Sequence, residues 1–308
     1  MSVTTSLPAP AHVQRRAGRG RVGGSQRAGY VFVAAYFVLL LLFGVAPTVY
    51  ALYLALTTEG GRWTGLHNFI ATGRDFRFLP AFEHIAVYLV IWLVALVVLV
   101  LFLALMLHGA VVRQTVPFFR FLFYIPGALA GSASVLVWLF ILDPPISPWH
   151  FVLSVFHDSN LGQTIAPGHL PFIFAMIAFW TGAGGWIVVM NGALNNISLE
   201  VIDSAKIDGA NAWQLAVRVK LPLIKRWVVF MLILAFAAGT QLFVEPQLVG
   251  AASLGMVSVT WSPNQLAYYL ATQSANFNYA AAISVDLLVV GLMAAALLVF
   301  RSKMFEIE

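Results

Sequence analysis

Six long apolar runs constrain the fold of this chain more than any other feature. A helix needs about 20 mostly apolar residues to cross the hydrocarbon core of a bilayer. Runs of this kind occupy residues 30–56, 86–107, 119–142, 172–194, 227–244 and 280–300. Only 9% of the residues are charged, whereas about 25% are charged in a soluble globular domain. The sequence therefore predicts an all-α integral membrane protein with six transmembrane helices.

The Lys and Arg residues predict which side of the membrane each loop faces, because they concentrate in short cytoplasmic loops. If the N-terminus is cytoplasmic, six spans place 14 of the 17 basic residues inside, and only Arg62, Arg74 and Arg77 outside. Both termini are therefore expected in the cytoplasm. We expect residues 1–28 to form a disordered basic arm and residues 29–308 the transmembrane domain. The positive charge is explained by topology, so we expect no nucleic-acid partner.

Several kinds of chemistry are excluded by what the sequence lacks. The chain has no Cys, so it has neither a disulfide nor a thiol nucleophile. Its seven His residues follow no metal-binding spacing, and no GxxxxGK[ST] pattern for holding ATP phosphates is present. We expect no catalytic residues, no metal and no cofactor bound by this chain. Trp63, Trp149 and Trp261 lie in the outer loops, where their rings suit a membrane interface.

Residues 197–223, here called the elbow, form a polar segment between the fourth and fifth runs. The first part predicts a short helix that Ser198 caps and Glu200 stabilises through the helix dipole. Asp203 and Lys206 lie one turn apart and can form an ion pair. Gly209 suits a left-handed residue at the helix end.

The second part of the elbow predicts another short helix. Asn211 and Gln214 have capping-box spacing, and the helix is expected to end before Pro222. A rigid helix–Gly–helix unit can dock in a partner and transmit its movement to the neighbouring spans. An amphipathic helix that lies on the bilayer surface is an equal alternative on spacing alone.

The elbow resembles the EAA loop of carbohydrate-type permeases from binding-protein-dependent ABC importers. That loop reads Glu-Ala-Ala, three residues, Gly, and a gap that ends in Leu-Pro. Asp203-Ser204-Ala205, Gly209 and Leu221-Pro222 occupy the matching positions here. The resemblance also includes residues 63–69, 118–138, 192–197, 243–246 and 277–282. It implies that the loop docks in an ATPase cleft through Glu200, Asp203, Ala205, Lys206, Asp208, Gly209, Ala210, Asn211, Leu221 and Pro222.

The same resemblance implies the function and the partners. The chain would be a multi-pass permease of the bacterial cytoplasmic (inner) membrane. Its partners would be a second permease subunit in a heterodimer, two ATPase subunits that hold ATP and Mg, an extracytoplasmic binding protein and membrane lipid. The substrate class would be a sugar or related polyol, and its identity stays open. A stand-alone secondary transporter and a membrane enzyme acting on lipid-linked sugars are the alternatives. Secondary transporters tend to have inverted repeats and broken helices, and the enzyme would need convergent catalytic groups.

Five residues are candidates for the substrate pathway. Gln241 and Glu245 are four apart, so they are expected on one helix face at the outer end of the fifth span. Trp180 and Trp186 flank a group of glycines in the fourth span, and Asp286 is an ionisable residue inside the sixth.

Each candidate also has a structural alternative. Gln241 and Glu245 can be a polar helix end, the region around Trp180 and Trp186 can serve helix packing, and Asp286 can be a hydrogen-bonded carboxylate at a helix or subunit interface. Gly127 and Gly131, beside Pro126, predict close packing and a kink in the third span.

Overall fold

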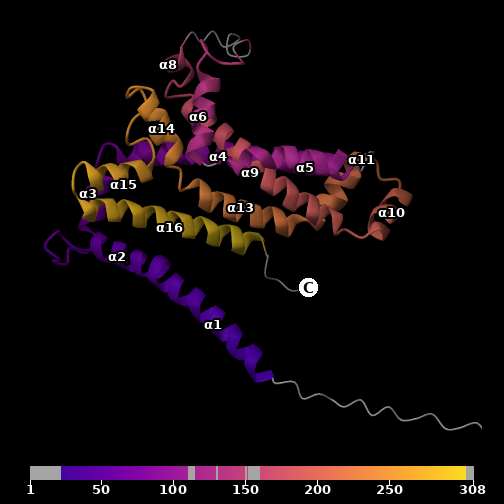
Figure 1. The fold of residues 1–308 in the computed structure, drawn as a ribbon, viewed down its shortest axis with the longest axis horizontal. Helices are drawn as coiled ribbons and strands as arrows, with labels where there is room; N and C mark the ends of the chain where they lie inside the picture. The colour runs from indigo at the N-terminus through magenta and orange to yellow at the C-terminus, as the bar shows by residue number, and fades with distance from the viewer. Residues whose placement is uncertain (1–21, 110–114, 130, 150, 152–159, 303–308) are drawn as a thin grey trace, which may run out of the picture. The chain divides into compact units, whose positions relative to one another are not determined.

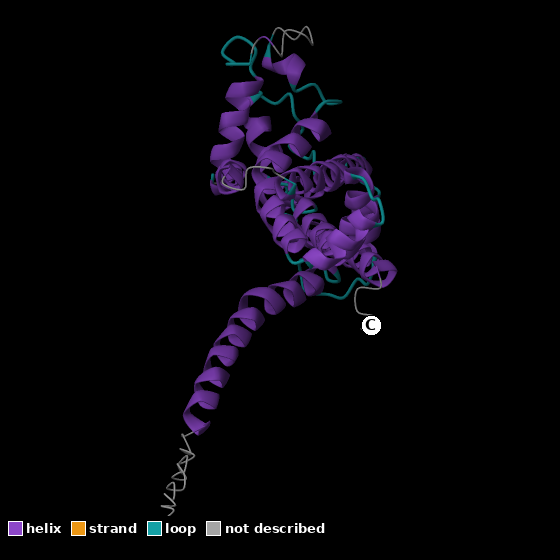
Figure 2. Cartoon of the chain, turned by 90° about the vertical axis from the view of Figure 1, so that its right-hand side faces the viewer, coloured by secondary structure: helices purple, strands orange, loops and turns teal. Residues whose placement is uncertain are grey.

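The computed structural model describes residues 22–109, 115–129, 131–149, 151 and 160–302. The chain divides into two units, Met1–Tyr50 and Ala51–Glu308. Throughout the described residues the secondary structure is helical, apart from one isolated bridge between Thr57 and Trp63 (Figure 2). This agrees with the predicted all-α class.

The first unit contains α1 (Val22–Leu40), a π-helical turn η1 (Leu41–Val45) and the beginning of α2 (Ala46–Ala55). Together they give a continuous apolar helix, Gly29–Ala55, where the sequence predicts a span over residues 30–56. Residues 1–21 of the basic arm, for which the sequence predicts disorder, lie outside the described residues. Residues 22–28 of that arm belong to α1.

The second unit holds the remaining helices, and their long axes give it its architecture. α4, α9, α13 and α16 run alongside one another, α3 and α15 lie at one end of this bundle, and α10 and α11 lie at the other (Figure 1). The bounds are α3 (His67–Gly73), α4 (Phe78–His108), α5 (Val116–Tyr124), η3 (Ile125–Ala128), α6 (Gly131–Leu142), α8 (Leu161–Thr164), α9 (Leu170–Asn195), α10 (Leu199–Ile207), α11 (Ala212–Gln214), η4 (Leu215–Lys220), α12 (Leu221–Leu223), α13 (Lys225–Gly239), α14 (Val244–Ala252), α15 (Pro263–Thr272) and α16 (Phe277–Ser302).

Four helices among the described residues are long and apolar enough to cross a membrane: Gly29–Ala55, Phe78–His108, Leu170–Asn195 and Phe277–Arg301. Two bent pairs also qualify, namely Val116–Ala128 with Gly131–Leu142, and Ala212–Leu223 with Lys225–Gly239. The predicted number of six spans is reached when each bent pair counts as one span.

The third and fifth predicted spans are not straight helices. The third turns by 98° at Leu129, which is extended with ψ of 135° and follows the short turn that contains Pro126. Pro removes a helical hydrogen bond, so a break there agrees with the predicted kink. The fifth span ends at Gly239 instead of residue 244, and a second helix begins at Val244.

The core of the second unit forms mainly where α4 meets α9. The buried side chains of α4 recur every three or four residues and face α9; they include Ile85, Leu89, Trp92, Leu96 and Val100. A Cβ added at Gly184 would collide with the carbonyl oxygen of Phe123, and one at Gly127 would lie 2.7 Å from that of Thr181. α9 therefore meets α5 and η3 backbone to backbone, as the packing interpretation of these glycines predicts.

Trp261 does not lie at an interface as its loop position suggests. Its side chain is only 2% exposed. It stacks on His84 with ring centroids 5.0 Å apart and meets Phe174 edge-on at 4.8 Å. The prediction of an interfacial role is wrong for this residue because the loop that carries it folds back against α4 and α9.

Candidate functional site

The first half of the elbow is α10, which ends in a Schellman turn. The N–H of Gly209 donates to the carbonyl oxygen of Lys206, and the N–H of Ala210 donates to that of Ala205, each at 3.0 Å. Gly209 has φ of +85°, a conformation that glycine adopts without a Cβ clash. These bonds fix the direction in which the chain leaves α10, and they confirm the predicted left-handed Gly209.

Two of the three side-chain predictions for α10 are confirmed. Lys206 donates to Asp203 at 3.0 Å, as predicted, and Glu200 lies in the first turn. Ser198 occupies the N-cap position, but its side chain makes no capping hydrogen bond.

The second half of the elbow begins with the predicted capping box. The backbone N–H of Gln214 donates to Oδ1 of Asn211 at 2.8 Å, and the N–H of Asn211 donates to Oε1 of Gln214 at 3.0 Å. The helical path does not end before Pro222, however. Pro222 lies in α12, which continues directly from η4, and the bend of 67° follows at Ile224.

The elbow has an anchored side and an exposed side. Ile202 and Leu215 are buried. Ile207 and Trp213 are 86% and 75% exposed, and Leu199 is exposed as well. Exposed large apolar side chains on one rigid segment mark a surface for a protein partner or for lipid.

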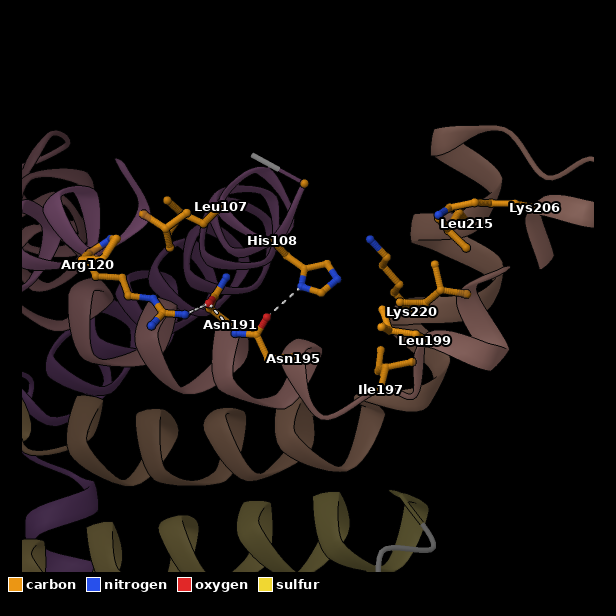
Figure 3. Close-up of a pocket in the computed structure, with 14 residues that line it drawn as sticks. Leu107, His108, Arg120, Asn191, Asn195, Ile197, Leu199, Lys206, Leu215 and Lys220 are labelled. Carbon is orange, nitrogen blue, oxygen red and sulfur yellow. Dashed lines mark hydrogen bonds between the residues drawn. The ribbon is translucent and has the colours of Figure 1, made fainter. Parts of the chain in front are cut away.

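A cavity of about 740 Å³ lies between the elbow and the ends of α4, α5 and α9 (Figure 3). We call it the elbow cavity. Oδ1 of Asn191 accepts hydrogen bonds from Arg120 and, at 3.0 Å, from the amide of Asn195. Oδ1 of Asn195 lies 3.2 Å from Nδ1 of His108. This polar chain connects three helices, and the sequence reasoning missed it. The sequence feature that could have indicated it is the pair Asn191 and Asn195, which lie one helical turn apart in an apolar run.

A second cavity, of about 330 Å³, lies where α4, α6, α9 and the α13–α14 turn meet. We call it the aromatic cavity. Gln241 and Glu245 both line it. They do not share a helix face as predicted, because α13 ends at Gly239 and Glu245 belongs to the first turn of α14. The turn between the two helices still brings both side chains to one cavity.

Two aromatic residues of α4 complete the aromatic cavity, and the sequence reasoning missed them. Tyr88 and Trp92 stack with centroids 5.8 Å apart and planes 14° apart. Trp92 is 6% exposed, and its Nε1 has no hydrogen-bond partner among the described residues. Their spacing of four residues placed them on one helix face. Gly239 leaves them room, because a Cβ there would lie 2.5 Å from Trp92.

The other three pathway candidates lie elsewhere. Trp180 meets Trp138 edge-on at 5.8 Å, and Trp186 meets Phe230 at 6.2 Å. Both are partly buried and pack against the core. Asp286 is half-buried within α16. None of the three lines either cavity, so the structure supports the packing alternative for the two Trp residues.

Comparisons with known proteins point to one family. Residues 97–302 match the family described as binding-protein-dependent transport system inner membrane component. The chain is 26% identical to the multiple sugar-binding transport system permease protein MsmF of Streptococcus mutans, over 91% of this chain and 96% of MsmF. It is 24% identical to the probable ABC transporter permease protein YesP of Bacillus subtilis, over 91% and 92% of the two chains.

Solved structures show a similar fold. A chain of a bacterial ABC transporter that imports the acidic polysaccharide alginate superposes with a TM-score of 0.74 at 19% identity. The match covers 92% of this chain and 98% of that one. The same fold is found when that transporter is bound to its periplasmic protein loaded with an alginate pentasaccharide, with a TM-score of 0.72.

Proposed function

The chain belongs to the family of binding-protein-dependent transport system inner membrane components, and from this premise we propose that its importer carries a sugar or a related polyol. The chain is a non-catalytic, multi-pass permease subunit of a bacterial ABC importer. Relatives named for multiple sugars, lactose and sn-glycerol-3-phosphate support the substrate class.

In this proposal the elbow couples the permease to ATP hydrolysis. A second permease subunit pairs with this chain, and two ATPase subunits that hold ATP and Mg each grip one elbow. Both termini and the elbow face the cytoplasm. The exposed Ile207 and Trp213 beside the fixed Gly209 turn support docking, because a rigid surface transmits the partner's movement without bending.

The transport cycle follows from this arrangement. Binding of ATP closes the ATPase subunits and tilts the helices attached to the elbows, so that the pathway opens toward a loaded binding protein. Hydrolysis then returns the permease to the inward-facing state.

The aromatic cavity is the observation that carries the substrate proposal. Sugar-binding sites combine an apolar aromatic face with a few placed polar groups. Here the Tyr88–Trp92 pair supplies the face, and Gln241 and Glu245 supply amide and carboxylate partners. Among the described lining residues none is Lys, Arg or His, and the one ionisable acid is Glu245. Such a lining favours a neutral polyhydroxyl substrate over an acidic one.

Reconstitution tests the proposed function. Purified permease is placed in vesicles with its ATPase subunits and its loaded binding protein, and sugar uptake is measured with and without ATP. We expect uptake only in the complete system with ATP. Uptake by the permease without any ATPase would favour a secondary transporter. Turnover of lipid-linked sugar without uptake would favour a membrane enzyme.

Glu245→Ala tests the aromatic cavity. Loss of a hydrogen bond to a charged group costs about 1.5–3 kcal/mol, which corresponds to a loss of roughly ten- to a hundredfold in uptake efficiency. Glu59→Ala, an exposed acid of the outer loop, serves as the matched control and should keep wild-type uptake. Equal uptake by the two variants would remove Glu245 from the pathway.

A further inference from the structure

The described lining of the elbow cavity contains several basic side chains and no acidic one. His108 of α4, Arg120 of α5, Lys206 of α10 and Lys220 of η4 all line it, whereas no Asp or Glu does among the described residues (Figure 3). Four different elements thus bring basic side chains to one place. Asp203 pairs with Lys206 outside the lining, and both partners of this ion pair are more than half exposed.

One of these basic groups lacks a full set of partners. Nε of Arg120 is buried and has no hydrogen-bond partner within the described chain, although its terminal nitrogen donates to Asn191. Lys206 and Lys220 line the same cavity, and an anion between its walls would offset their like charges.

The rest of the lining is apolar. Leu107, Val116, Ile197, Leu199, Ile202 and Leu215 contribute side chains to it. The cavity lies where the spans α4 and α9 end, at His108 and Asn195. This is the depth at which lipid headgroups meet helix ends, and basic pockets between transmembrane helices on the cytoplasmic side bind anionic headgroups. A free phosphate would use the basic groups but not the apolar walls.

We propose that the elbow cavity binds the phosphodiester headgroup of an anionic phospholipid, with Lys220 at the phosphate and the apolar walls against the glycerol and upper acyl chains. The choice of the cytoplasmic leaflet rests on the proposed orientation of the permease. The bound lipid joins α10 and η4 to the ends of α4, α5 and α9. It would thereby stiffen the connection between the elbow and the spans.

The test measures lipid binding by the assembled importer in nanodiscs. Spin-labelled phosphatidylglycerol is the probe, in a background of phosphatidylcholine. One Lys near an anionic surface contributes about 1 kcal/mol, so Lys220→Gln should weaken the binding about fivefold. Lys225→Gln is the control, because it removes the same charge from an exposed position that does not line the cavity. Lys220→Arg should retain the binding.

Each other outcome overturns the proposal in a distinct way. Equal binding by the Lys220→Gln and Lys225→Gln variants would show that general surface charge holds the lipid. Displacement of the probe by soluble glycerophosphate at the same affinity would assign the cavity to a free anion. ATP-dependent uptake is recorded on the same samples. Intact uptake with no lipid preference sinks the lipid site alone, whereas absent uptake in every sample sinks the proposed function.

Discussion

Gly209 is the residue on which the geometry of the elbow depends. Its φ of +85° is disfavoured for any residue with a Cβ, although no atom lies within 4 Å of the place a Cβ would occupy. Gly209→Ala should therefore cost about 1–2 kcal/mol of backbone strain without a clash. We expect the variant to insert normally and to show reduced uptake per ATP hydrolysed.

Gly255→Ala is the matched control for this prediction. Gly255 has φ of +89° and equally open surroundings, but it lies in the loop after α14. The ratio of sugar taken up to ATP hydrolysed should fall only for Gly209→Ala. A similar fall in both variants would mean that backbone strain anywhere disturbs transport.

Residue-level predictions succeed where the cause lies within a few residues. The turn at Gly209 and the box between Asn211 and Gln214 depend on local backbone geometry, so spacing alone was enough. The burial of Trp261 and the position of Tyr88 in the lining of the aromatic cavity both depend on contacts between segments far apart in sequence. A single sequence gives no signal for which face of an apolar helix meets which neighbour.

Substitution of Gly184 tests how closely α9 must approach α5. A Cβ there would collide with the backbone of Phe123, whereas nothing lies within 4 Å at the neighbouring Gly185. Overpacking a well-packed core costs about 1–3 kcal/mol, and a backbone clash cannot be relieved by a rotamer change. Gly184→Ala should lower the thermal unfolding midpoint of the purified protein, and Gly185→Ala should not. Equal midpoints would contradict the close contact between α5 and α9.

Element boundaries show the limits of hydropathy. Apolar length placed the first, fourth and sixth spans within a few residues of their helices, whereas α4 begins at Phe78, well before residue 86. It joined α5 to α6 and extended α13 beyond Gly239, because an apolar composition does not reveal where a helix bends. Pro126 predicted the kink but not a turn of 98°.

The orientation of the whole molecule can be tested directly, since the chain contains no Cys. Single Cys residues are introduced at Ser204 in the elbow and at Leu254, which is 96% exposed in the loop after α14. An impermeant maleimide should label Leu254→Cys in intact cells and Ser204→Cys only after the membrane is permeabilised. Labelling of both in intact cells would overturn the cytoplasmic elbow.

The contact of α9 with α5 and η3 through Gly184 and Gly127 leaves no room for these segments to move independently. No side chain stands between the two backbones, so no rotamer can yield and absorb a small displacement. α10 begins at Leu199, four residues after α9 ends at Asn195, so only a short linker separates the elbow from α9. In the proposed coupling, α5 would move with α9, and the bend at Leu129 would pass that movement to α6, whose Gly131 borders the aromatic cavity. A movement of the elbow at one end of the bundle would thereby change the shape of the proposed substrate cavity.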